Sequence, residues 1–125
     1  MAWNRRNKFH AVKITTPDGV FDSKKEFRRW VVLKELQKSG EISGLERQKL
    51  FELIPAHREP DTVGPKGGIK KGKVIEKACS YIADFCYYTR SGEFVVEDTK
   101  GVRTLDYVIK RKLMLDKYGI RIKEV

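Results

Sequence analysis

Two carboxylates lie in the most apolar part of the chain, where a charged side chain is costly. Residues 81–88 are almost all aromatic, β-branched or small, and Asp84 is the only charged residue among them. A second apolar run starts at Phe94 and reaches Asp98, and Lys100 follows two residues later. Oxygen ligands with a lysine nearby are suited to Mg²⁺. The spacing therefore points to metal chemistry first.

The turn between the two runs brings these acids together. Its sequence is Thr-Arg-Ser-Gly-Glu, and a three-residue loop with Gly92 in the left-handed conformation predicts a type I turn with a bulge. Such a loop pairs Thr89 with Glu93. Counting back along both strands then places Asp84 opposite Asp98, with Cβ atoms about 5 Å apart.

Opposed carboxylates on a sheet need an explanation, because like charges repel and desolvation of each ion is unfavourable. A divalent metal between Asp84 and Asp98 is the simplest one. Strand alternation puts Lys100 on the same face as Asp98 and turns Glu97 to the other face. The alternative is an exposed Asp98–Lys100 pair at a strand end, with Asp84 held by backbone N–H groups.

A third acid lies at the start of the first predicted helix, which runs from residue 22 or 23 to about residue 39. The sequence Ser-Lys-Lys-Glu over residues 23–26 has the form of a capping box, in which Glu26 reaches back to the N-cap amide. Capping is the stronger interpretation from spacing alone. Because the helix must pack on the sheet, Glu26 can also project toward the two strand acids.

The remaining elements complete an α/β (α+β) fold with a mixed central sheet flanked by helices. Residues 11–21 predict a short hairpin, and residues 45–54 predict an extended segment. Thr104 is a predicted N-cap for a helix over residues 105–118, and a last strand follows over 120–125. A strand, helix and strand of this length predict a crossover that makes the last strand parallel to the strand of Asp98.

Length and charge limit the class of protein. A chain of 125 residues fits one domain, so we expect a single domain over residues 1–125. A net charge of +10 favours a polyanionic partner, and nucleic acid is the leading candidate. No stretch approaches the ~20 apolar residues of a membrane span, so we expect an intracellular protein. Cys79 and Cys86 are expected to be reduced core residues.

Two basic segments are candidates for contact with phosphates. Residues 56–73 are rich in Pro, Gly and charge, which predicts a mobile basic loop whose Lys70 and Lys71 meet nucleic acid; a solvated loop is the alternative. The N-terminus carries Arg5 and Arg6 beside a tryptophan, which indicates either a nucleic-acid arm or a soluble terminus.

The motifs FDSKKEF, YIADF and VVEDTKGVRTLDY, in this order, resemble the PD-(D/E)XK nuclease superfamily. They are more closely similar to a family of small phage-encoded endonucleases, formerly of unknown function and related to Holliday-junction resolvases. The resemblance implies a restriction-endonuclease-like αβββαβ core. The chain departs from the superfamily in having Ala83 in place of Pro and Asp98 where Glu is frequent, but neither change removes a ligand oxygen. The resemblance assigns these catalytic residues: Glu26, Asp84, Asp98 and Lys100.

This resemblance implies a Mg²⁺-dependent endodeoxyribonuclease, with Mn²⁺ able to substitute. Asp84 and Asp98 would hold the metal and Glu26 would complete the site, while Lys100 would orient the attacking water. Branched DNA is the favoured substrate, which implies a homodimer, and the cytoplasm of a bacterial host is the expected location if the protein is phage-encoded. Arg103 and Lys110 are candidates for phosphate contact, against solvated charge as the alternative.

Two other functions stay open at this stage. One is a nicking or site-specific endonuclease that acts on linear duplex DNA. The other is a non-catalytic nucleic-acid-binding module whose acids are structural. Asp84 and Asp98 argue against the binding module, but the sequence does not separate the two kinds of nuclease.

Overall fold

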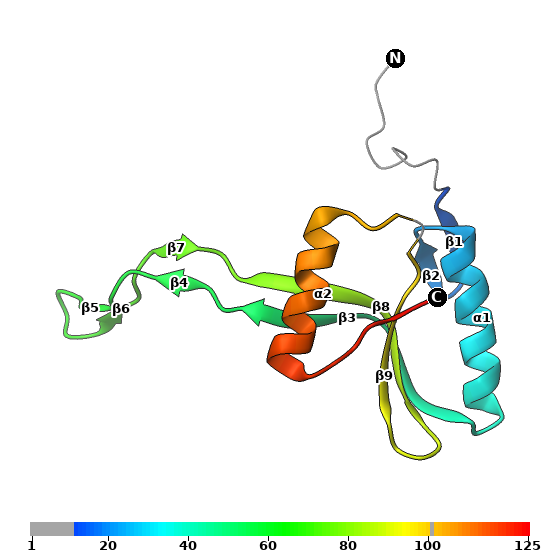
Figure 1. Ribbon diagram of the computed structural model, residues 1–125. Helices are drawn as coiled ribbons and strands as arrows, with labels where there is room; N and C mark the ends of the chain where they lie inside the picture. Colours follow the sequence, from blue (N-terminus) through cyan, green and yellow to red (C-terminus); the bar gives the residue numbers. More distant parts are fainter. Residues whose placement is uncertain (1–11, 101) are drawn as a thin grey trace. The chain divides into compact units, whose positions relative to one another are not determined.

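The computed structural model describes residues 12–100 and 102–125 (Figure 1). They divide into two compact units by their contacts. Among these residues, the first unit holds 12–49, 83–100, 102 and 122–125. The second unit holds 50–82 and 103–121. Two long strands, β3 (Ile42–Ile54) and β8 (Cys79–Thr89), contribute residues to both units.

A four-stranded mixed sheet is the central element, with the strand order β10-β9-β8-β3. The strand β9 (Phe94–Asp98) is antiparallel to β8, and the short strand β10 (Lys123–Glu124) is parallel to β9. The two helices are α1 (Lys24–Lys38) and α2 (Leu105–Tyr118). The order α1, β3, β8, β9, α2, β10 is the predicted αβββαβ order, so the mixed α+β fold class and the parallel last strand are confirmed.

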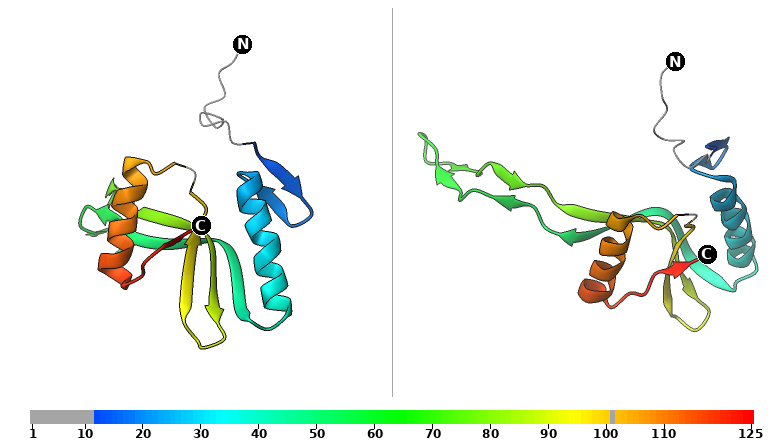
Figure 2. Two further views of the ribbon diagram at one scale, coloured as in Figure 1. Left: turned by 45° about the vertical axis from the view of Figure 1, so that its right-hand side comes forward. Right: turned by 45° about the horizontal axis from the view of Figure 1, so that its top comes forward.

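The core of the first unit lies between α1 and one face of the strands. Its fully buried members include Phe21, Leu33 and Phe85, and the Trp30 ring stacks on Phe85 with ring centroids 6.0 Å apart. Burying each such side chain contributes about 1.5–3 kcal/mol. This packing fixes α1 beside the sheet, so the first turn of α1 has a defined position (Figure 2).

The predicted hairpin before α1 is confirmed as β1 (Ile14–Thr16) and β2 (Gly19–Phe21). Arg47 of β3 ties it to the sheet, because its guanidinium donates to the carbonyl oxygens of Asp18 at 3.3 Å and Val20 at 2.8 Å. The guanidinium also lies 3.7 Å from the centroid of the Phe21 ring. Gly19 has φ +123°, and a Cβ atom there would lie 2.9 Å from Arg47, so this turn requires glycine.

The second unit contains the segment that the sequence predicts as a mobile basic loop, and the structure gives this segment short paired strands. Residues 56–73 belong to an antiparallel ribbon that continues β3 and β8 (Figure 1). The strand β4 (His57–Arg58) pairs with β7 (Val74–Glu76), and β5 (Thr62–Val63) pairs with β6 (Ile69–Lys70). Backbone hydrogen bonds across the ribbon supply the order that apolar burial does not, and an Asp61 side chain accepts from the Gly72 amide at 3.0 Å.

Within the second unit, an aromatic cluster packs α2 on residues 50–54 of β3 and 79–82 of β8. The Phe51 ring contacts the rings of Tyr81 and Tyr118, with centroids 6.5 Å and 5.8 Å apart, and the Tyr118 hydroxyl donates to the Glu52 carbonyl at 2.5 Å. The helix has the predicted bounds, with Thr104 as N-cap and a left-handed C-cap at residue 119. No helix in the described part of the chain is long and apolar enough to cross a membrane.

Candidate active site

The β8–β9 hairpin has the predicted register. The Thr89 amide donates to the Glu93 carbonyl at 2.8 Å, and Gly92 adopts φ +90° in the turn. Paired residues then run back from the turn as far as Phe85 with Glu97, so the next residues on the two strands are Asp84 and Asp98. The two acids are therefore neighbours across the ends of adjacent strands.

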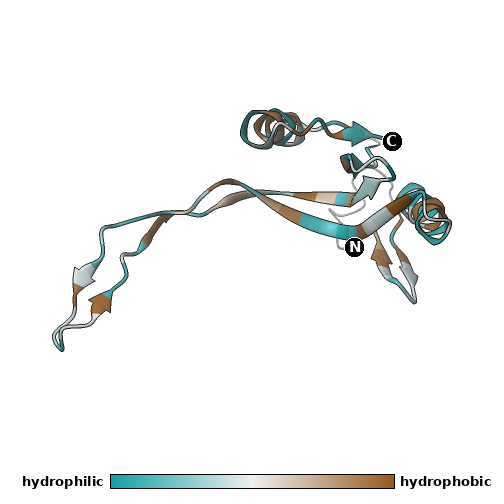
Figure 3. Cartoon of the chain, turned by 90° about the horizontal axis from the view of Figure 1, so that it is seen from below, coloured by the Kyte–Doolittle hydropathy of each residue, from teal (hydrophilic) through white to brown (hydrophobic). Residues whose placement is uncertain are grey.

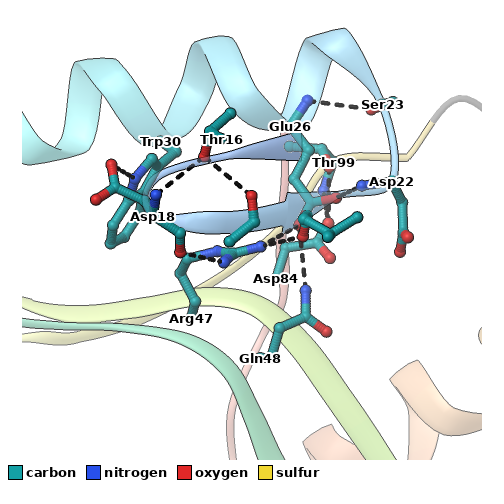
Figure 4. Close-up of polar contacts among 12 residues, drawn as sticks. Thr16, Asp18, Asp22, Ser23, Glu26, Trp30, Arg47, Gln48, Asp84 and Thr99 are labelled. Atoms are coloured by element: carbon teal, nitrogen blue, oxygen red, sulfur yellow. Dashed lines mark hydrogen bonds and ion pairs between the residues drawn. The ribbon is translucent and has the colours of Figure 1, made fainter. Parts of the chain in front are cut away.

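Asp84 is half-buried and is held by the residue after Asp98. Its Oδ2 atom accepts hydrogen bonds from the Thr99 amide at 2.8 Å and from the Thr99 hydroxyl at 2.7 Å (Figure 4). The backbone contact is one that the structural interpretation of Asp84 predicts, and it also fixes the orientation of the carboxylate.

Asp98 differs from the exposed acid that the same interpretation predicts, because its side chain is only 2% exposed. Lys100 Nζ lies 3.4 Å from Asp98 Oδ1, and the lysine is itself partly buried. The Lys25 ammonium reaches the Lys100 carbonyl at 3.5 Å, which links this strand end to the first turn of α1. Because Asp98 is buried, it needs the neighbouring ammonium group of Lys100 to compensate its charge.

Glu26 is both a cap and a member of the acid group. Ser23 Oγ accepts from the Glu26 amide at 3.1 Å, as the capping box predicts. The glutamate, however, accepts from the Asp22 amide at 3.1 Å and not from the N-cap amide. Its other oxygen accepts from Gln48 Nε2 at 3.1 Å and lies 3.9 Å from an Arg47 nitrogen. Figure 4 shows these groups gathered under the first turn of α1.

Glu26 is electrostatically coupled to the strand acids. The side chain is 2% exposed, and burial raises its pKa to about 7, with repulsion from Asp84 as the next largest cause. The Asp22 amide and the Arg47 guanidinium act in the opposite direction and lower this pKa. A carboxyl group with this pKa gains or loses its proton near neutral pH, which is a common property of functional sites.

Gln48 is a site residue that sequence reasoning missed. It has φ +52°, and it is the one non-glycine residue with positive φ among the described residues. A left-handed residue within a strand costs about 1–2 kcal/mol and tends to occur at functional sites. The side-chain amide that contacts Glu26 comes from this strained position. No sequence signal marks the strain, because Gln48 stands in a run of four polar residues, 46–49, with no Gly, Asn or Asp among them.

Glu97 occupies the opposite face of β9, as predicted, and is fully buried there. Arg29 of α1 donates to its two carboxylate oxygens at 2.7 Å and 2.6 Å, and the Tyr87 hydroxyl donates a short hydrogen bond to it. Burial and the bond to Glu97 raise the pKa of Tyr87 to about 12. This network fixes β9 against α1. A charged residue in a buried strand requires such a partner, so the sequence contained a signal for it.

The predicted metal ligands Glu26, Asp84 and Asp98 all belong to the first unit. Within residues 12–100 and 102–125, however, no group of three or more His, Cys, Asp or Glu side chains is arranged to hold a metal ion. Cys79 and Cys86 are free thiols, as predicted. The metal site therefore stays a prediction that rests on the type and placement of the acids.

The predicted phosphate-binding residues that the structure describes lie in the second unit. Lys70 is exposed on β6, and Lys71 follows it. Arg103 is exposed just before the N-cap of α2, and Lys110 lies on α2 itself. These four residues and the acid group therefore belong to different units. Two further predicted residues lie outside the described part of the chain: Arg5 and Arg6.

Comparison with known proteins gives one family. A family model described as "Protein of unknown function (DUF1064)" matches residues 6–123. No curated protein and no solved structure matches the chain.

Proposed function

The chain belongs to the DUF1064 family, whose description assigns no activity, and we propose from its site that it is a metal-dependent DNA endonuclease. It hydrolyses phosphodiester bonds, and branched DNA of the Holliday-junction type is its preferred substrate. The observation that carries the proposal is the buried Asp98, which follows the Phe85–Glu97 pair on the strand opposite Asp84 and is ion-paired with Lys100. The resemblance to PD-(D/E)XK nucleases supports the same assignment.

The residues present suit a hard divalent cation. Asp84 and Asp98 supply carboxylate oxygens from adjacent strands, and burial together with repulsion from Asp84 raises the pKa of Glu26. Carboxylates and water are the ligands that Mg²⁺ prefers. A bound Mg²⁺ would polarise the scissile phosphate and lower the pKa of an attacking water. In this proposal Asp84 and Asp98 hold the ion, and Glu26 completes the site directly or through water.

The other residues of the site have separate tasks. Lys100, held beside Asp98, orients the attacking water and offsets the negative charge that develops on the phosphate. Thr99 fixes the Asp84 carboxylate through its two hydrogen bonds. Gln48 fixes Glu26 in the same way, so that the acids are oriented before the substrate binds.

The preference for branched DNA comes from the resemblance to junction-resolving enzymes, and it carries requirements for charge and symmetry. A net charge of +10 favours a phosphate polymer as the partner. Resolution of a four-way junction needs two symmetric cuts, and one site of this kind cuts one strand. A two-fold dimer supplies the second site, and such dimers are the commonest soluble oligomers.

A cleavage panel tests this proposal. Linear duplex, single-stranded, flap and four-way-junction substrates are incubated with Mg²⁺, with Mn²⁺ or with EDTA. We expect metal-dependent cleavage that is fastest on the junction. Faster cleavage of linear duplex, or single nicks, would favour the nicking or site-specific endonuclease. No cleavage of any substrate with either metal would contradict the proposal.

The second candidate is a nucleic-acid-binding module without catalysis. The contacts of the acids favour it, because Asp84 is held by Thr99 and Asp98 by Lys100, and because no three-residue metal group exists in the described part of the chain. Under this alternative the acids are structural. Asp98→Asn then lowers the melting temperature of the metal-free protein, whereas repulsion between metal ligands predicts an unchanged or raised value.

A further inference from the structure

The ribbon of the second unit exposes its apolar side chains. Every residue of β4, β5, β6 and β7 is exposed. Val63 and Ile69 form a cross-strand pair in β5 and β6, with 77% and 78% of their surfaces exposed. Paired residues point to the same side of a ribbon, so these two form one apolar knob near the tip. Figure 3 shows apolar and hydrophilic residues side by side along this ribbon.

The tip is nonetheless an ordered structure. The Gly64 amide donates to the Gly68 carbonyl at 2.7 Å, and the Gly67 amide donates to the Gly64 carbonyl at 3.0 Å, which closes the turn. Lower on the ribbon, Arg58 donates to the Gly72 carbonyl at 3.1 Å. A two-stranded hairpin without an apolar face to bury is only marginally stable in water. Its exposed apolar pair therefore points to a partner.

The charge of the tip selects the kind of partner. Residues 62–73 contain four lysines and no acidic residue. Thr62 is opposite Lys70 in the β5–β6 pair, so a lysine comes next to the apolar pair along the strand, on the other face of the ribbon, and Lys71 and Lys73 follow it in the sequence. A second copy of this chain, at a net charge of +10, is a poor match for such a surface. A phosphate backbone, with thymine methyl groups and sugars in the groove between its strands, matches both features.

We propose that this ribbon is a groove-binding arm for duplex DNA. Its lysines contact phosphates on both sides of a groove, and Val63 and Ile69 contact the bases and sugars between them. A two-stranded ribbon fits the major groove, and proteins that use the minor groove insert apolar side chains at base steps. The inference rests on the proposed function only for the choice of DNA as the nucleic acid.

Binding of a labelled duplex of about 30 base pairs, measured by fluorescence anisotropy with EDTA present, tests the arm without cleavage. Val63→Ser/Ile69→Ser should weaken binding at least about tenfold, since the apolar contact is lost, and should leave the salt dependence unchanged. Lys70→Ala/Lys71→Ala should weaken binding and lower the slope of log affinity against log salt by about 1.8. Val63→Leu/Ile69→Leu should bind as tightly as the unchanged chain, because it keeps the tip apolar.

Val31→Ser/Val32→Ser is the matched control, because both valines are about half exposed on α1. It should bind within twofold of the unchanged chain. The arm would be overturned if Val63→Ser/Ile69→Ser bound duplex DNA as tightly as the unchanged chain. It would also be overturned if this variant kept its affinity for DNA and instead lost self-association or binding to an acidic protein. Tighter binding of single-stranded DNA than of the duplex would rule out binding in a groove. If the ribbon variants bind DNA normally while the unchanged chain cleaves it, only the arm is refuted. If the ribbon variants bind weakly but the unchanged chain does not cleave DNA, only the nuclease is refuted.

Discussion

Glu26 couples the stability of the fold to pH through a single buried carboxyl group. Its pKa is raised from 4.5 to about 7, so between these values the folded chain keeps a proton that the unfolded chain has lost. Stability from this group is therefore full below pH 4.5 and falls as the pH rises to 7, by on the order of 3 kcal/mol. The loss is complete above pH 7.

Replacement of this glutamate by its neutral isostere should remove that pH dependence. We expect the stability of Glu26→Gln relative to the unchanged chain to increase as the pH rises from 4.5 to 7.5 in EDTA, because glutamine does not titrate. Urea unfolding at a series of pH values measures it. Parallel curves for the two proteins would show that the glutamate titrates normally. Loss of cleavage with this stability gain would mark Glu26 as catalytic, whereas normal cleavage would leave only the cap.

Replacement of Gln48 should affect activity much more than stability. Gln48→Gly relieves the left-handed strain of a non-glycine residue but removes the hydrogen bond to Glu26. We expect stability within about 1 kcal/mol of the unchanged chain and a clear loss of cleavage. Gln48→Asn, which keeps an amide and tolerates the same backbone, is the companion variant. Full activity of Gln48→Gly would exclude a positioning role.

At the scale of elements, the buried pair of Arg29 and Glu97 fixes β9 against α1. Removal of one partner leaves a buried charge without compensation, so Arg29→Met should destabilise the protein by about 3–5 kcal/mol. Arg29→Met/Glu97→Leu should recover most of that loss, because apolar replacements of both partners are often tolerated. Denaturant unfolding measures both. Additive losses in the double variant would contradict a direct pair.

Local signals explain which elements were predictable. The bounds of α2 and the register of β8 with β9 follow from short-range chemistry: a threonine cap, a glycine stop and a turn with Gly92. The ribbon over 56–73 was not predictable in this way, since its strands are paired by backbone hydrogen bonds and bury nothing. Apolar periodicity, the main sequence signal, is absent there.

The candidate site was predictable in its residue types and less so in its supports. Asp84, Asp98 and Lys100 follow from strand alternation and the hairpin turn. Gln48 required knowledge of a backbone angle inside β3, and the Thr99 contact to Asp84 required knowledge of how far β9 extends. Both depend on tertiary structure, which the order of residues does not specify locally.

At the scale of the whole molecule, resolution of a junction requires two sites. We therefore expect a two-fold dimer before DNA binds, because residues 12–100 and 102–125 of one chain contain one such acid group. Light scattering without DNA should give twice the mass of one chain, and a junction on a supercoiled plasmid should show paired incisions. A monomer that only nicks the plasmid would instead support the nicking endonuclease.

The central claim is that the buried aspartate at the end of β9 is a catalytic metal ligand. Its most direct test is single-turnover cleavage of a four-way junction in Mg²⁺ by Asp98→Asn, with Asp116→Asn on α2 as the exposed control. We predict that Asp98→Asn slows cleavage at least about a hundredfold while binding in EDTA is kept or tightened, because ligand charge and its repulsion of phosphate are lost together. Cleavage by Asp98→Asn at the rate of the unchanged chain would contradict the account.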